Sequence, residues 1–261
     1  MMDRLYRVEM AGAECYVIER GDCWYELKGD IYAGYEAGLQ LAAEEVAAAR
    51  VLAPVMPSKI VAVGLNYRDH AKEMGKKLPD EPLIFLKPST AVIGPLDAIV
   101  LPVAAGRVDH EAELGIVIGK TAYQVPADCA QEYVLGLTCV NDVTDRDLQR
   151  RDVQYTRGKG FDTFAPIGPA VAVGVDGTAL DVESAVNGDL RQSSNTRELI
   201  FSLDQLVEFV TGVMTLLPGD IISTGTPSGV GPLCAGDRVT VKVEGVGELI
   251  NDVVSDERSG R

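Results

Sequence analysis

The chain has 261 residues, enough for one large domain or for a main domain with a smaller appendage. It carries 24 Lys plus Arg against 39 Asp plus Glu, and the net charge of −15 argues against nucleic acid or an anionic membrane surface as a partner. The five cysteines are scattered without a Cys-x-x-Cys pair, which argues against a zinc ribbon or a disulfide framework. A charged amino terminus and no apolar stretch of membrane length predict a soluble cytoplasmic protein.

The first 57 residues are predicted to form a small α+β module of their own. Alternating polar and apolar residues at 15–18 and 22–27 indicate two strands. An alanine-rich run from 39 to 50, closed by prolines, predicts a helix.

The rest of the chain, 58–261, is predicted to be mainly β. Short β-branched runs bounded by glycine and proline indicate strands at 60–63, 83–85, 99–101, 114–118, 169–173, 238–243 and 248–253. Asn187-Gly188 predicts a hairpin between strands, because both residues tolerate the positive φ angles of a two-residue turn. Helices are expected at 127–135, at 145–152 and after Ser202, which has capping-box spacing to Gln205. The irregular order of these elements favours a mixed α+β fold, mainly β with a few helices.

Two carboxylates lie two positions apart in a strand-like run, at Glu111 and Glu113. Alternate side chains of a strand share a face, so these two are expected to project together while His110 points the other way. Like charges this close repel unless a proton or a cation lies between them, and carboxylate oxygens are the ligands that Mg²⁺ prefers. A metal site is one interpretation. Two glutamates on a hydrated strand face are the other, and the spacing alone favours neither.

A further acid, Asp142, ends an apolar run shortly before a helix is expected to begin. Arg146 and Gln149 are three residues apart on the same face of that helix, so both would reach one bound anion. The alternative is a hydrated helix start, whose acids are favoured by the positive end of the helix dipole.

Only two histidines, His70 and His110, are available for acid-base chemistry. Glu73 follows His70 by three residues and would orient its imidazole ring if the segment is helical. The polar residues 74–82 have the composition of a mobile surface loop, which is consistent with a lid that carries its own base. An exposed His and Glu on a surface helix fit equally well. His110 is expected to pack or to form hydrogen bonds inside the structure.

Lys159 lies between two glycines that let the backbone approach a ligand closely. Residues 224–231, which include Thr226, supply hydroxyls and exposed amides that suit a carboxylate. A glycine-rich turn between strands is the simpler explanation of the same residues. Neither stretch has the phosphate-binding pattern of ATP or dinucleotide sites.

Taken together and in this order, seven segments resemble the fumarylacetoacetate hydrolase family. They are Gly-x-Asn-Tyr-x-x-His-x-x-Glu at 64–73, Leu-Lys-Pro-Ser-Thr at 86–90, Glu-x-Glu-Leu at 111–114, Asp-x-Thr-x-Arg-Asp at 142–147, Gly-Lys-Gly-Phe-Asp at 158–162, the Asn-Gly turn with its following Gln and Asn-Thr at 187–196, and Ser-Thr-Gly-Thr-Pro-Ser-Gly-Val-Gly at 223–231. The likeness runs from about Lys59 to Val254 and leaves out the amino-terminal module.

The resemblance implies a catalytic domain of the mixed β-roll type at 58–261, usually in a homodimer. The roles that it assigns are metal ligands of Mg²⁺ or Mn²⁺ at Glu111, Glu113 and Asp142, catalytic groups at His70, Glu73 and Lys159, and substrate-binding groups at Arg146, Gln149, Thr226 and Lys87. One departure is Asp145, where the family commonly has alanine. Its charge either weakens the binding of an anionic substrate or points to solvent.

The activity implied is that of a metal-dependent enzyme acting on a small anionic 2-oxo acid, dicarboxylic or of the acylpyruvate type. The reaction would pass through an enolate and end in carbon-carbon hydrolysis or decarboxylation. The same residues suit a keto-enol tautomerase or an isomerase of 2-hydroxy-dienedioates from aromatic breakdown. An alternative of a different class is a protein that binds metal or dicarboxylate without turnover, and the presence of His70, Glu73 and Lys159 argues against it.

Overall fold

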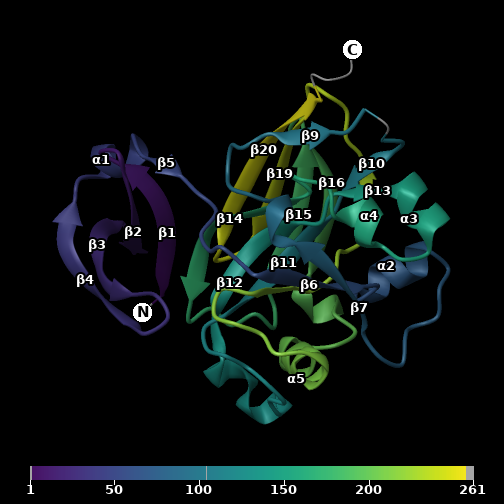
Figure 1. The fold of residues 1–261 in the computed structure, drawn as a ribbon, viewed down its shortest axis with the longest axis horizontal. Helices are drawn as coiled ribbons and strands as arrows, with labels where there is room; N and C mark the ends of the chain where they lie inside the picture. Colours follow the sequence, from purple (N-terminus) through teal and green to yellow (C-terminus); the bar gives the residue numbers. More distant parts are fainter. Residues whose placement is uncertain (1, 104, 257–261) are drawn as a thin grey trace.

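The protein is mainly β, as the sequence predicts, and its strands form one large sheet and two smaller ones (Figure 1). The computed structural model describes residues 2–103 and 105–256. The strands of the large sheet are β1 (Asp3–Met10), β2 (Ala13–Arg20), β3 (Cys23–Asp30), β4 (Gly34–Leu41), β5 (Arg50–Val51), β6 (Lys59–Gly64), β7 (Leu83–Pro88), β8 (Val92–Ile93), β11 (Ala112–Ile118), β12 (Val134–Asn141), β14 (Ala165–Val173) and β17 (Ile221–Ser223). Their order is β4-β3-β2-β1-β14-β12-β11-β17-β6-β7, with β5 paired to β1 and β8 to β14.

The smaller sheets and the helices complete the fold. The three-stranded sheet has β13 (Thr144–Asp145), β10 (Val108–His110) and β18 (Gly231–Pro232), and the five-stranded sheet has β16 (Asp189–Asn195), β15 (Asp181–Val186), β19 (Arg238–Val243), β20 (Gly247–Ser255) and β9 (Ile99–Leu101). The helices are α1 (Ala43–Ala47), α2 (Arg68–Glu73), α3 (Arg146–Asp152), α4 (Thr156–Lys159) and α5 (Leu203–Val213), with short 3-10 helices η1 (Ser89–Ala91), η2 (Ala127–Glu132) and η3 (Thr196–Glu198). Within the described part of the chain, no helix has the length and apolar character needed to cross a membrane.

The amino-terminal strands are joined to the rest by backbone pairing. β1 lies antiparallel to β14, with Leu5 opposite Val171. Leu5 and Ile18 belong to the same buried cluster as Ile167 and Val171. This amino-terminal part therefore extends the large sheet at one end (Figure 1). The division of the chain at residue 57 into two domains stays a prediction.

The helix predicted at 39–50 is wrong in extent. β4 continues to Leu41 and pairs with β3, and α1 covers only Ala43–Ala47. Arg50–Val51 then pairs with β1 as β5. Backbone pairing with neighbouring strands outweighs the helix propensity of the alanines here.

The remaining local predictions agree with the structure except at one helix. The segment 127–135 is a 3-10 helix that ends at Glu132, because Val134 already belongs to β12. The hairpin turn is present, with Asn187 at φ 54°. The capping box at Ser202 starts α5 as expected.

β11 is the strand that positions the candidate site. All of its residues are buried because both of its faces are covered. Leu114 and Ile116 pack in the cluster that includes α5, and Val117 packs in the cluster on the other face. β11 is antiparallel to β12, with Ala112 opposite Asn141. The acids that the sequence singles out lie beside these two strand ends.

Candidate active site

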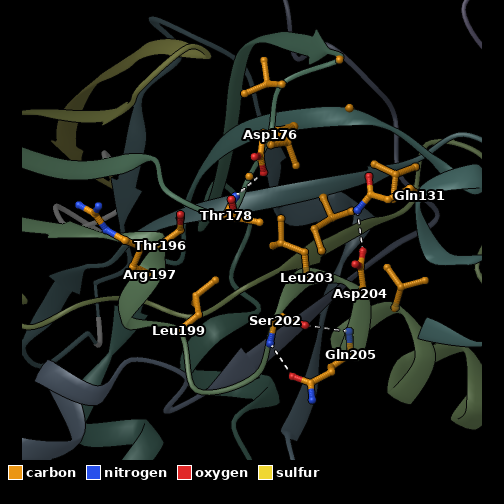
Figure 2. A pocket seen from close by; sticks show the side chains of 18 of the residues that line it. Gln131, Asp176, Thr178, Thr196, Arg197, Leu199, Ser202, Leu203, Asp204 and Gln205 are labelled. Atoms are coloured by element: carbon orange, nitrogen blue, oxygen red, sulfur yellow. Dashed lines mark hydrogen bonds between the residues drawn. The ribbon is translucent and has the colours of Figure 1, made fainter. Parts of the chain in front are cut away.

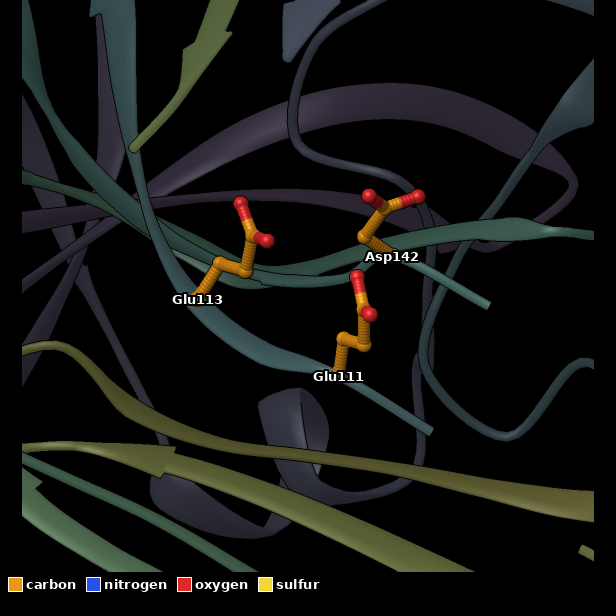
Figure 3. Close-up of side chains that lie close together, drawn as sticks. All are labelled: Glu111, Glu113 and Asp142. Carbon is orange, nitrogen blue, oxygen red and sulfur yellow. The ribbon is translucent and has the colours of Figure 1, made fainter. Parts of the chain in front are cut away.

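Three buried carboxylates meet where β11 begins and β12 ends (Figure 3). Glu111, Glu113 and Asp142 each offer one oxygen, and these oxygens lie within 4.8 Å of one another. The Asp142 amide donates to the Glu111 carbonyl at 2.9 Å, which fixes the residue after β12 against the start of β11. The prediction that Glu111 and Glu113 project together is confirmed, although Glu111 lies between β10 and β11 rather than inside a strand.

The electrostatic surroundings of the three carboxylates differ. Burial opposes the ionisation of Glu111, but Arg146 and Lys159 outweigh burial and hold the pKa of Glu111 below its usual range. Burial, together with the charges of Asp142 and Glu111, raises the pKa of Glu113 to about 8. Without a bound cation, Glu113 therefore tends to hold a proton near neutral pH, because no positive charge offsets its neighbours as strongly as Arg146 and Lys159 offset Glu111.

The donor set fits a hard divalent cation. Glu113 Oε2 accepts hydrogen bonds from the Ser223 hydroxyl at 2.6 Å and from the Gly225 amide at 2.9 Å. Among residues 2–103 and 105–256, no hydrogen bond reaches its Oε1. A buried carboxylate oxygen that accepts no hydrogen bond and lies close to two other carboxylates would be stabilised by a bound cation. Carboxylate oxygens favour Mg²⁺ or Mn²⁺ over metals that prefer thiolate or imidazole.

Lys159 lies against this cluster at the end of α4. Its Nζ donates to Glu111 Oε2 at 2.8 Å, to Asp142 Oδ2 at 2.5 Å and to Thr144 Oγ1 at 2.8 Å. Burial alone would lower the pKa of Lys159, but the two carboxylates raise it, so the side chain is cationic. The neighbouring Gly158 has a packing role, because a Cβ there would come within 2.9 Å of a backbone nitrogen of α3.

His70 and Glu73 form a dyad on α2. The segment is helical, as their spacing requires, and His70 Nδ1 lies 2.9 Å from Glu73 Oε2. Two further contacts hold the helix in place. Asp69 accepts a hydrogen bond from the Ser194 hydroxyl at 2.7 Å, and Glu73 Oε1 accepts one from the Gly229 amide at 3.2 Å.

His110 lies away from the carboxylates, as predicted. Its side chain is buried, with Nδ1 at 3.2 Å from Gln192 Oε1 and 3.3 Å from Ser184 Oγ. Burial lowers the pKa of His110, so it is neutral at physiological pH. His70 is therefore the imidazole available at the site.

Arg146 and Gln149 share one face of α3, and Arg146 Nη1 donates to Gln149 Oε1 at 3.0 Å. Arg146 also donates through Nη2 to Glu111 Oε1 at 2.5 Å and through Nε to Asp109 Oδ2 at 2.8 Å. Its guanidinium is thereby held beside the carboxylate cluster.

A cavity of about 550 Å³ brings the predicted groups together, and every predicted site residue except Lys87 lines it, Thr226 included. Lys87 is fully buried. Its Nζ bonds to Asp142 Oδ1 and to the Val143 carbonyl at 3.2 Å. Lys87 thus touches the site through Asp142, and its role as a substrate-binding group stays a prediction.

A second cavity, of about 590 Å³, lies at the amino-terminal end of α5 (Figure 2). Two of its polar lining side chains are paired with neighbours. Asp176 accepts from the Thr178 amide at 3.0 Å, and Gln131 donates to Asp204 at 2.6 Å. None of the predicted site residues is among the described residues that line it. The reactive groups are therefore concentrated in the other cavity.

Asp145 is buried and does not point to solvent. Its Oδ1 accepts hydrogen bonds from the Asp147 and Leu148 amides, each at 3.0 Å, and so caps the start of α3. Its Oδ2 accepts a hydrogen bond from the Gly106 amide at 3.2 Å. The additional charge is thus bound by backbone amides.

Arg107 and Asp109 are among the charged residues of the cavity lining that were not predicted, as are Lys76 and Arg150. Asp109 is 1% exposed, and it binds Arg107 Nε at 2.7 Å as well as Arg146 Nε. A signal for them exists in the sequence. Positions 107 and 109 continue the alternation that relates Glu111 to Glu113, so they are expected on the same face.

The fumarylacetoacetate (FAA) hydrolase C-terminal family model matches residues 59–254. The mitochondrial oxaloacetate tautomerase FAHD2B of Bos taurus is 44% identical over 216 residues, which are 78% of this chain and 69% of that protein.

Solved structures give the same result. The 2-hydroxyhepta-2,4-diene-1,7-dioate isomerase from Mycobacterium marinum has a TM-score of 0.90 at 39% identity, covering 98% of this chain and 99% of its own. The maleylpyruvate hydrolase from Sphingobium sp. SYK-6, in complex with manganese(II) and pyruvate, has a TM-score of 0.80 at 32% identity, covering 97% of this chain and all of its own. The protein described here therefore belongs to the fumarylacetoacetate hydrolase family.

Proposed function

We propose that the protein is a divalent-metal-dependent enzyme that converts small 2-oxo acids by way of an enolate intermediate. The reaction would be carbon-carbon bond hydrolysis or decarboxylation. The observation that supports this most is the meeting, in one cavity, of an imidazole base, a buried lysine and three carboxylates. The Sphingobium hydrolase, which was solved with manganese(II) and pyruvate, supports Mg²⁺ or Mn²⁺ as the cofactor and a pyruvoyl group in the substrate.

Substrate binding would begin at the carboxylates. Glu111, Glu113 and Asp142 are the residues that would hold the ion. A divalent cation bound there would polarise the 2-oxo group of a chelating acid. Arg146 and Gln149 line the same cavity and would bind the adjacent carboxylate group.

Lys159 would stabilise the negative charge that develops on the oxo oxygen. Its Nζ is fixed by three hydrogen bonds and is buried, so its charge acts at short range and in the absence of bulk water. A positive charge that is already in place needs no reorganisation when the negative charge develops.

The His70–Glu73 dyad would carry out the proton transfer that the reaction requires. Glu73 accepts the hydrogen bond of His70 Nδ1, which leaves Nε2 to take a proton. In hydrolysis His70 removes a proton from water, and the resulting hydroxide attacks the C4 carbonyl. The C3–C4 bond then breaks, its electron pair passes to the pyruvoyl fragment as an enolate, and a proton at C3 completes the product.

Tautomerisation is the second candidate, since it needs only the proton transfer by His70. It is supported by the name of the bovine relative, an oxaloacetate tautomerase that is 44% identical. The isomerase from Mycobacterium marinum supports proton transfer as well. The same side chains would serve both outcomes.

The test is Glu111→Gln, with Glu248→Gln as a control, since Glu248 is half-exposed and is not among the described residues that line the cavity. We expect the Glu111 variant to stay folded, to bind Mg²⁺ weakly and to lose at least about 100-fold in turnover, because one of three carboxylate ligands is gone. Metal binding is measured by calorimetry. Turnover is followed by enol absorbance and product analysis with acetylpyruvate, fumarylpyruvate, oxaloacetate and a hydroxy-dienedioate.

A wild-type rate in the Glu111 variant would contradict the metal assignment. If the wild type binds metal tightly and converts none of the four acids, the non-catalytic binding protein becomes the better explanation. Product identity separates hydrolysis, decarboxylation and tautomerisation.

A further inference from the structure

Arg107 and Arg146 lie opposite each other where two short strands pair. β10 is antiparallel to β13, with Val108 opposite Asp145, so the register places Arg107 opposite Arg146. The Arg146 amide donates to the Arg107 carbonyl at 2.8 Å. Two like charges in this position destabilise a strand pair unless an acid lies between them.

Asp109 is that acid. It is 1% exposed and has one arginine on each oxygen, Arg107 Nε at 2.7 Å from Oδ1 and Arg146 Nε at 2.8 Å from Oδ2. All three residues line the cavity that contains the carboxylate cluster. A single buried carboxylate thus holds two guanidinium groups at the cavity wall.

Arg107 and Arg146 differ in how many of their guanidinium N–H donors remain without a partner. Arg146 uses its remaining nitrogens on Gln149 and Glu111. Within the described residues, Arg107 Nη1 and Nη2 have no hydrogen-bond partner, and the Arg107 side chain is 50% exposed. Such a planar pair of donors matches the two oxygens of a carboxylate.

The backbone of Arg107 is held in place by the acids at the start of α3. Asp145 Oδ2 accepts from the Gly106 amide and Asp147 Oδ2 from the Arg107 amide, each at 3.2 Å. The loop passes so close to α3 that a Cβ on Gly106 would lie 2.0 Å from Asp147 Oδ2. Asp145, the departure from the family pattern, therefore helps to place a cation in the cavity.

We propose that Arg107 is a specificity-determining residue that binds a second carboxylate of the substrate, so that the enzyme selects 2-oxo acids with two carboxylates over those with one. This inference rests on the proposed function, in which the 2-oxo acid end of the substrate lies at Arg146 and the carboxylate cluster. Lys76 and Arg150 also line the cavity and add to its positive charge. The described lining has five Lys and Arg and five Asp and Glu side chains, so a bound divalent cation would make the cavity net positive and favour a dianion over a monoanion.

The first test compares fumarylpyruvate, which has a terminal carboxylate, with acetylpyruvate, which lacks one. Arg107→Gln is expected to raise KM for fumarylpyruvate about 10- to 100-fold and to change kcat less than about 3-fold, because a charge-assisted bidentate contact is lost. KM for acetylpyruvate is expected to change less than about 2-fold. Arg107→Lys restores part of the loss, since the charge returns without the planar fork.

Arg191→Gln is the matched control. The Arg191 side chain is 49% exposed, as Arg107 is 50% exposed, and Arg191 lies outside the cavity lining. It is expected to leave both substrates unaffected.

The second test measures binding without turnover. In the presence of Mn²⁺, calorimetry compares 2-oxoglutarate with 2-oxopentanoate, two five-carbon acids that differ in the terminal carboxylate. The wild type is expected to bind the diacid more tightly, and Arg107→Gln is expected to remove that difference while leaving Mn²⁺ affinity unchanged.

Two results would overturn the assignment of Arg107 and leave the proposed function intact. One is an equal effect of Arg107→Gln on diacids and monoacids. The other is a wild type that does not distinguish them. A wild type that neither binds nor converts any of these acids would overturn the proposed function itself, and the role of Arg107 with it.

Discussion

Two of the three buried carboxylates at the site, Glu111 and Asp142, form ion pairs with buried lysines. Lys159 bonds to both Glu111 and Asp142, and Lys87 bonds to Asp142 from a fully buried position. Within the described chain, the hydrogen bonds that Glu113 accepts come from neutral donors. The cluster therefore combines two carboxylates already paired with lysines and one that lacks a cationic hydrogen-bond partner.

Lys87→Met tests the pairing at Asp142. Burial lowers the pKa of Lys87. Its Nζ nevertheless donates to the Asp142 carboxylate, which also accepts a hydrogen bond from Lys159. Removing it leaves Asp142 buried with less compensation, so the free energy of unfolding is expected to fall by about 3–5 kcal/mol. Urea denaturation provides the measurement.

The control for this variant is Lys242→Met, whose ion pair with Glu248 is half exposed. Its effect is expected to be below about 1 kcal/mol. Equal effects of the two variants would show that the buried pair contributes no more than a surface one.

Local spacing explains which of these residues the sequence predicts. Glu111 and Glu113 follow the strand period, and His70 and Glu73 follow the helical one, so each pair can be inferred from its own segment. Lys87 lies 55 residues from Asp142 in the chain, and only the strand arrangement brings them together. No local pattern contains that information.

At the level of elements, Asp220 joins the parallel strands β6 and β17. Its Oδ1 accepts hydrogen bonds from the Ser58 amide at 2.9 Å and the Ser58 hydroxyl at 2.7 Å. Its Oδ2 accepts from Lys59 Nζ at 2.6 Å and from the Leu217 amide at 2.9 Å. Burial opposes the ionisation of Asp220, but these donors outweigh burial and lower its pKa from 3.8.

Asp220→Asn is expected to lower the free energy of unfolding by about 2–4 kcal/mol at neutral pH, because charged and neutral donors lose their carboxylate. A carboxyl group with a lowered pKa stabilises the fold fully above its unfolded-state pKa, and this stabilisation is lost as the pH falls through the folded-state value. The difference between variant and wild type is therefore expected to shrink below about pH 4. Denaturant unfolding from pH 3 to 7 measures it.

Asp252→Asn serves as the control, since its ion pair with Arg238 is exposed. A stability difference for Asp220→Asn that is constant across this pH range would contradict the role of its ionised form.

The elements that the sequence predicts well are those with local signals. The turn at Asn187 and the cap at Ser202 depend on a few adjacent residues. The segment around Leu41 is different, because its conformation depends on the partner strand β3. Likewise, the pairing of β1 with β14 joins residues far apart in the chain and has no signature in either strand alone.

On the scale of the whole molecule, the site is assembled from segments that are distant in sequence. α2, the start of β11, the end of β12, α4 and the residues after β17 all contribute side chains to one cavity. The large sheet supports this assembly, since β12, β11, β17 and β6 are successive neighbours in it. The homodimer and the cytoplasmic location stay predictions.

Metal binding is expected to stabilise the whole fold, because the ion would relieve repulsion between buried carboxylates. At a Mg²⁺ or Mn²⁺ concentration 100 times Kd, linkage adds about 2.7 kcal/mol, which corresponds to a rise in Tm of about 5 °C or more for a chain of this size. Calorimetric scans with and without EDTA measure the shift. An unchanged Tm at saturating metal, or an equal rise in Glu111→Gln, would contradict it.

The docking of α2 also bears on the stability of the His70–Glu73 dyad. α2 has six residues, and a helix of this length is not stable on its own in water. Its contacts with Ser194 and Gly229 are therefore part of what keeps it helical. Undocking and melting of α2 are then one equilibrium, so hydrogen exchange at its amides reports on how stably the His70–Glu73 dyad is formed.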